Sequence, residues 1–156
     1  MIRAAVTSLL MIGALAGCDE NPAAAGGSGA AGTMPELPAI LVTHDDPPIG
    51  SALNHRVVRA SREVAVRLEP RWGDVQPRIL TVAPENRDRL GAELRKALPT
   101  DWQIEPLDGV APKGTRLYGF SSGGRFFAAL LVEPEGAPVT PVVILRNRKL
   151  LDMTKG

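Results

Sequence analysis

Cysteine occurs once in this chain, at Cys18, and histidine occurs only twice. A lone cysteine excludes an internal disulfide, so the fold is not one of the small disulfide-stapled scaffolds. A catalytic zinc site needs three convergent ligands, which two histidines with one thiol supply poorly. We interpret His44 with the adjacent Asp45 and Asp46 as an exposed acidic turn. We therefore expect no metal and no other cofactor.

Aromatic residues and net charge are also scarce. Aromatics make up 4% of the sequence, and the formal net charge is +1 at pH 7. So mild a charge does not favour nucleic-acid binding, and we expect no nucleic-acid partner. The arginines that follow one helical stretch have two interpretations, a solvated face or a surface for anionic lipid heads or an acidic partner. These are Arg56, Arg59, Arg62, Arg67 and Arg71.

The apolar run at the amino terminus is too short to cross a bilayer. It covers residues 4–16 after the basic Arg3, whereas a transmembrane helix needs about 20 apolar residues. The layout is that of a secretory signal peptide. It ends in Leu15-Ala16-Gly17-Cys18, which resembles the lipobox of bacterial lipoproteins. The resemblance implies removal of residues 1–17 and lipidation of Cys18; the alternative is an ordinary secretory signal.

Lipidation would define the location of the protein without help from the folded part. Acyl chains on Cys18 would anchor it to a membrane on the periplasmic side of a Gram-negative envelope. Asp19 slightly favours the inner membrane over the outer one, as in enterobacterial lipoproteins. Residues 18–38 are rich in alanine and glycine, so we expect a flexible tether there. Residues 39–156 form a single domain by length.

Helical and strand patterns alternate along this domain. We predict a helix from Ser51 that ends at Pro70, although the alternation of Val64, Val66 and Leu68 also permits a strand in its last third. We expect a loop over residues 71–77 and a second helix that begins at Pro84 and stops at Pro99. Strand patterns occupy residues 78–82, 102–105, 115–120, 125–133 and 139–145. We therefore predict a small α+β domain of two layers, in which about two helices pack on one face of a mostly antiparallel sheet of four to five strands.

The segment Ser121-Ser122-Gly123-Gly124 predicts a β-hairpin, because glycine accepts the positive φ angles of tight turns. It is not a nucleophile elbow, which joins a strand to a helix. Trp72 and Trp102 are predicted core anchors. No pattern supplies a nucleophile, a base and an orienting group together, so we expect a protein that is not an enzyme.

The last strand pattern contains Pro141, which cannot donate a ladder hydrogen bond, so we predict an edge strand there. An edge strand offers unpaired backbone groups to a partner, and the basic residues that follow could steer an acidic one. The candidate partner-binding residues are Thr140, Arg146, Arg148 and Lys149.

The second half of the domain contains four short motifs. They are Asp88-x-Leu90-Gly91-x-x-Leu94-x-x-x-Leu98, Trp102-x-Ile104, Thr115-Arg116-Leu117-Tyr118 and Phe126-Phe127-Ala128-Ala129-Leu130-Leu131-Val132. Over about seventy residues this pattern resembles the TrbH-type lipoproteins of conjugative plasmid transfer. The resemblance implies an envelope component of a type IV secretion apparatus, with no catalytic residues.

The leading hypothesis is a membrane-anchored envelope lipoprotein whose domain binds an envelope protein. The alternative is a stand-alone periplasmic module that binds a cell-wall or anionic ligand through its arginine-rich face.

Overall fold

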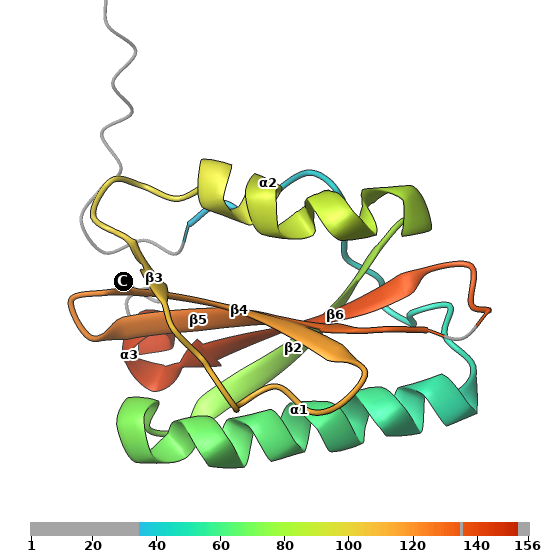
Figure 1. Ribbon diagram of the computed structural model, residues 1–156, viewed down its shortest axis with the longest axis horizontal. Coiled ribbons are helices and arrows are strands. Elements are labelled where there is room, and N and C mark those ends of the chain that lie inside the picture. Colours follow the sequence, from blue (N-terminus) through green and yellow to red (C-terminus); the bar gives the residue numbers. More distant parts are fainter. Residues whose placement is uncertain (1–34, 135, 153–156) are drawn as a thin grey trace, which may run out of the picture.

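The computed structural model describes residues 35–134 and 136–152. Cys18, Asp19 and the expected tether up to residue 34 lie outside the described residues. Figure 1 shows the arrangement of the elements. In chain order they are β1 (Leu41–Val42), α1 (Ser51–Trp72), β2 (Val75–Val82), the 3-10 helix η1 (Pro84–Arg89), α2 (Leu90–Lys96), β3 (Gln103–Glu105), β4 (Thr115–Ser122), β5 (Arg125–Val132), β6 (Thr140–Asn147) and α3 (Arg148–Asp152).

The strands form one antiparallel sheet in the order β1-β2-β6-β5-β4-β3. The predicted α+β class with an antiparallel sheet is confirmed. The described part of the chain has six strands and three α-helices, where we predicted four to five and about two. The additional elements are the two-residue β1 and the five-residue α3. Segments this short carry too little periodicity to be recognised in the sequence.

The helices lie on both faces of the sheet, so the predicted two-layer arrangement is wrong. Figure 1 shows α2 above the sheet and α1 below it. The cause lies in β5, which is buried at all of its eight residues. Its side chains alternate between a core cluster that includes Leu90 and Leu94 of α2 and one that includes Val57 and Val64 of α1. A strand that is apolar at successive positions needs cover on each face.

Helix α1 buries one stripe, which consists of Val57, Ala60, Ser61, Val64 and Leu68. The predicted end at Pro70 is wrong, because Pro70 lies inside the last turn of the helix. A proline there removes only one hydrogen bond, to the carbonyl of Val66, and the side chain of Val66 is 63% exposed. The helix instead ends at Gly73, whose φ of 69° favours glycine and whose N–H donates to the Glu69 carbonyl.

Strand β6 is central, so the predicted edge position is wrong. It pairs with β2 on one side and with β5 on the other. The N–H of Arg148 donates to the Asp74 carbonyl at 3.3 Å, so by alternation the nitrogen of Pro141 points towards β5. Pairing with β5 begins only at Val142. Pro141, which has no backbone N–H, therefore lies one residue beyond the end of the β5–β6 pairing. Its missing N–H interrupts neither ladder.

The predicted hairpin and the start of the second helical segment agree with the structure. Gly123 and Gly124 join β4 to β5 with φ values of 55° and 80°. Pro84 begins η1, which continues as α2 and ends at Lys96, before the predicted stop at Pro99. Gly91 of α2 is buried against Tyr118. A side chain at this position would not fit without a shift, because an added Cβ would lie 2.6 Å from Cε1 of Tyr118.

The fold also includes residues that we expected in the tether. Pro35 is buried, and Leu37 packs against the core cluster on the α2 face of the sheet. The folded unit therefore extends at least to Pro35.

Two positions on α1 test its orientation. Leu68 is 2% exposed and Val66 is 63% exposed. We expect Leu68→Ala to lower the free energy of unfolding by about 2–5 kcal/mol, because it removes buried methyl groups and leaves a cavity. Val66→Ala is the matched control, with an expected change within about 0.5 kcal/mol. Urea unfolding of the two variants measures the difference; equal values would contradict this orientation of α1.

Candidate interaction surface

The predicted partner-binding residues do not form an open strand edge. Thr140 is fully buried, and its Oγ1 has no hydrogen-bond partner among the described residues. Arg146 is part of the paired region of β6. Lys149 donates from Nζ to the Gly123 carbonyl at 2.7 Å, which ties α3 to the β4–β5 turn. Arg148 is exposed at the start of α3. The four side chains therefore do not act together as a strand-addition site.

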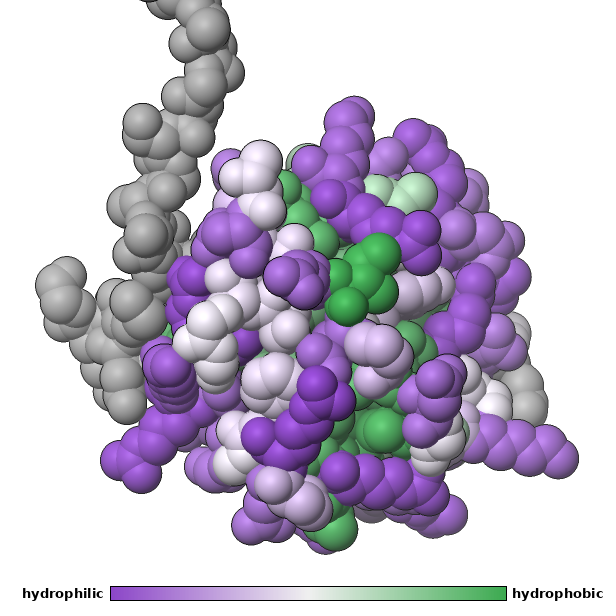
Figure 2. Space-filling view, turned by 60° about the vertical axis from the view of Figure 1, so that its left-hand side comes forward, coloured by the Kyte–Doolittle hydropathy of each residue, from purple (hydrophilic) through white to green (hydrophobic). Residues whose placement is uncertain are grey.

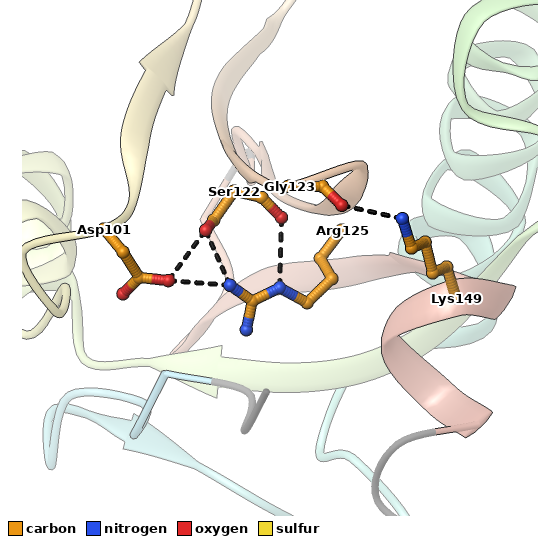
Figure 3. Close-up of polar contacts among 5 residues, drawn as sticks. All are labelled: Asp101, Ser122, Gly123, Arg125 and Lys149. Atoms are coloured by element: carbon orange, nitrogen blue, oxygen red, sulfur yellow. Dashed lines mark hydrogen bonds and ion pairs between the residues drawn. The ribbon is translucent and has the colours of Figure 1, made fainter. Parts of the chain in front are cut away.

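A polar cluster closes the β4–β5 turn (Figure 3). The Arg125 Nη2 atom lies 2.6 Å from Asp101 Oδ2 and 2.6 Å from Ser122 Oγ. The Ser122 hydroxyl also hydrogen-bonds to Asp101 Oδ2 at 2.7 Å. The guanidinium of Arg125 lies over the ring of Trp102, 5.2 Å from its centroid. Trp102 is 6% exposed and packs against Phe127, so the cluster is joined directly to the core.

The chemistry of this cluster is that of a structural clamp. Hydrogen bonds from Ser122 and from Arg125 lower the pKa of Asp101 below its ordinary value. A carboxylate with a lowered pKa is a weak base, so it does not activate the Ser122 hydroxyl as a nucleophile. Nor does a histidine contact that hydroxyl in the described part of the chain.

A second polar contact, on the α1 face of the sheet, fastens the carboxyl end of α1 to β3. Glu105 is buried, and its Oε1 lies 2.6 Å from Nη2 of Arg71 in an ion pair that lacks hydrogen-bond geometry. Its other oxygen, Oε2, accepts from the Ser121 hydroxyl at 2.9 Å. Next to it, Trp72 stacks on Phe126 with ring centroids 4.5 Å apart. Trp72 and Trp102 are thus core anchors, as predicted.

Figure 2 shows the end of the molecule that lies to the left in Figure 1. Hydrophobic residues reach the surface there only as small patches between hydrophilic side chains. This face of the molecule therefore offers no broad apolar area.

The arginines of α1 divide into three groups. Arg56 donates to the Glu133 carbonyl, and Arg67 donates to the carbonyls of Gly109 and Val110. Arg71 pairs with Glu105. In contrast, Arg59 and Arg62 are exposed and make no hydrogen bond or ion pair within residues 35–134 and 136–152. The arginine-rich stretch is therefore partly a clamp on neighbouring loops, and only two of its cations are available for a partner.

An apolar groove runs between α1 and β2 beside these two arginines. It has a volume of about 340 Å³ and is lined by Val58, Ser61, Arg62, Ala65, Pro77 and Ile79. Val58 is 40% exposed. A larger concavity of about 590 Å³ adjoins it, but its lining comes from the outer side chains of α1 alone. A single convex helix forms no enclosed cavity, so we treat both as one open surface.

The outer edge of β2 lies next to this groove. Strand β1 covers only Thr81 and Val82 of that edge. Because the Asp74 carbonyl faces β6, the backbone polar groups of Val75, Pro77 and Ile79 point away from the sheet. Pro77 has no N–H, so it interrupts this edge and limits strand addition. We had expected a loop up to residue 77; the edge position is what allows Pro77 to lie in a strand.

Neither metal-binding groups nor a spanning helix stand out in residues 35–134 and 136–152. No three histidine, cysteine, aspartate or glutamate side chains converge there. His44 is held by Thr81, with its Nε2 atom 2.7 Å from Oγ1. None of the described helices is long and apolar enough to cross a membrane.

Comparison of the chain with protein-family models, with curated proteins and with solved structures finds no significant match.

The sequence analysis identified only part of the α1–β2 surface. It noted the arginines, but it did not recognise Val58 and Val66 as a second apolar face of the helix. Their spacing of eight residues, offset from the buried stripe, is the signal that could have identified a second apolar face.

The clamp at the β4–β5 turn predicts a pH dependence. Since the pKa of Asp101 is lowered in the folded state, its contribution is complete above the ordinary pKa of 3.8 and is lost as the pH falls through the lowered value. Asp101→Asn should remove this part of the acid sensitivity of the melting temperature, whereas Asp108→Asn in an exposed loop should not. A carboxyl titration of Asp101 by NMR with an ordinary midpoint would contradict the clamp.

Proposed function

We propose that the protein is a membrane-anchored envelope lipoprotein whose domain binds a protein through the α1–β2 surface. The anchor is the lipid on Cys18 at the end of the lipobox. The α1–β2 surface supports the interaction part of the proposal. Exposed valines and the outer edge of β2 lie there, with Arg62 in the groove and Arg59 on the adjoining surface of α1, and neither arginine has a partner within the described residues. Apolar area rimmed by charge is typical of protein interfaces.

A component of a conjugative type IV secretion apparatus is the specific form of this proposal. The support for it is the resemblance to TrbH-type lipoproteins, and the role is structural rather than enzymatic. The alternative, a module for a cell-wall or anionic ligand, loses support because Arg56, Arg67 and Arg71 are engaged by carbonyls or by Glu105. Of the five arginines on that helix, Arg59 and Arg62 are the two without a hydrogen bond or ion pair to the described residues, so an anionic ligand would find two cations there.

The anchor is tested by Cys18→Ser. We expect this variant to lose incorporation of a labelled fatty acid and to leave the membrane fraction, because the sulfur is the site of attachment. Gly26→Ala, in the same amino-terminal region, is the control and should stay labelled. Labelling of Cys18→Ser at the level of the unchanged chain would overturn the anchor.

The surface is tested by a photo-crosslinking amino acid at Ile79, which lines the groove. We expect a protein adduct in membranes of the native host, because the side chain faces the bound partner. The control is the same amino acid at the exposed Arg95 of α2, on the other face of the sheet. Adducts at Arg95 with none at Ile79 would contradict this surface.

A further inference from the structure

The outer surface of α1 carries a stripe distinct from the buried one. It includes Val58, Arg62, Ala65, Val66 and Glu69, which recur at the three- and four-residue intervals of one helix face. Val58 and Val66 are 40% and 63% exposed. Such a stripe is the usual seam of a helix that packs against another helix.

Charge is distributed unevenly along this stripe. Its amino-terminal half carries Arg59 and Arg62, and its carboxyl-terminal half carries Glu69, with Asp74 just beyond the helix. All four side chains are exposed, and none has an ion pair or side-chain hydrogen bond within the part of the chain that the structure describes. Arg62, Glu69 and Asp74 line one shallow hollow of about 220 Å³ together with Val66.

The neighbouring charges behave differently. Glu63 pairs with Arg67 one turn further along α1, and Arg71 pairs with Glu105. Ion pairs are thus satisfied on the flank of α1 that faces the loop after β3. Among the described residues, Arg62, Glu69 and Asp74 have no such partner and lie on the flank that faces β2. Arg59 also has none, but it lies on the outer surface of α1 and borders the loop before β4.

We propose that the α1–β2 surface binds a second copy of this chain in an antiparallel, two-fold arrangement. In this arrangement Arg62 of each copy faces Glu69 of the other, and Arg59 lies towards Asp74. The two-fold axis passes close to Val66, so the valines meet at the centre and the ion pairs flank them. The inference rests on the proposed function, because it names the protein that the α1–β2 surface binds.

The argument for a second copy is the self-complementary charge. A two-fold interface places the same patch on both subunits, so a patch that is basic at one end and acidic at the other matches itself when reversed. An anionic lipid surface or an acidic peptide would meet Arg59 and Arg62 but would be repelled by Glu69 and Asp74. A second copy satisfies both halves with one operation.

Anchoring favours such a contact. Two copies tethered to the same membrane have a much higher effective concentration than free proteins, so a modest interface suffices. The interrupted edge at Pro77 keeps the assembly closed, because it opposes continued strand addition beyond the pair.

The test uses the full chain with Val66→Cys in native membranes under mild oxidation. We expect a disulfide-linked species of twice the mass, because the two introduced thiols lie near the axis. The unchanged chain controls for Cys18, and Arg95→Cys controls for random collision between exposed cysteines. Equal dimer from Val66→Cys and Arg95→Cys would overturn the proposal.

Charge reversal in the Val66→Cys background identifies the partner. Arg62→Glu and Glu69→Arg should each reduce the dimer by about tenfold or more, because like charges then face each other. Co-expression of these two variants with different tags should restore a mixed dimer, and the double variant should restore its own.

The outcomes separate this proposal from the proposed function. Loss of the dimer in Arg62→Glu with no recovery in the mixed pair would overturn the second copy. A Val66 or Ile79 adduct to another protein alone would keep the interaction surface and likewise overturn the second copy. Equal fatty-acid labelling of Cys18→Ser and of the unchanged chain, with an intact dimer, would overturn the lipid anchor at Cys18 and leave the dimer standing.

Discussion

The burial of β5 and β6 on both faces is the constraint on which the rest of the structure depends. Phe126 to Val132 and Val142 to Leu145 are apolar at consecutive positions, and all of these residues are buried. An antiparallel pair of this kind cannot leave one face to water, because about half of its side chains would be exposed. Helix α1 covers one face, and α2 with the partly buried Leu37 and Ile40 covers the other. Strand β2 pairs with β6 and strand β4 pairs with β5, so neither central strand has a free edge.

Local signals in the sequence predicted the parts of this fold that depend on local chemistry. Gly123 and Gly124 predicted the β4–β5 hairpin, since their positive φ angles are a property of the turn itself. Pro84 correctly marked the start of a helical segment, but Pro70 and Pro141 misled us, because the effect of a proline depends on what lies beside it. Pro70 is tolerated in the last turn of α1, where it removes one hydrogen bond, and Pro141 is tolerated where the β5 ladder has ended. Neither circumstance is contained in the residues around the proline.

The candidate site shows the same division. The sequence revealed five arginines on one helical stretch, but it did not reveal which of them bind groups within the fold and which do not. Arg67 and Arg56 reach carbonyls that are distant in sequence, at Gly109, Val110 and Glu133, whereas Arg59 and Arg62 make no hydrogen bond or ion pair within the described residues. The order of strands decides this result, because it places the loop after β3 on one flank of α1 and β2 on the other. Strand order is a long-range property that periodicity does not report.

The two polar clusters lie around β3 and the β4–β5 turn, and they pair the charged groups there within the fold. Ser121 and Ser122 are adjacent on β4, so their side chains point to opposite faces of the sheet. Ser121 hydrogen-bonds to Glu105 on the α1 face, and Ser122 hydrogen-bonds to Asp101 on the α2 face. Because each carboxylate also contacts an arginine, the charged groups there already have partners within the fold. Within the described residues, Arg62, Glu69 and Asp74 have no such partner and lie on the flank of α1 beside β2, where exposed valines and the outer edge of β2 adjoin them. This contrast in intramolecular pairing is the reason that we place the proposed interaction on the α1–β2 surface.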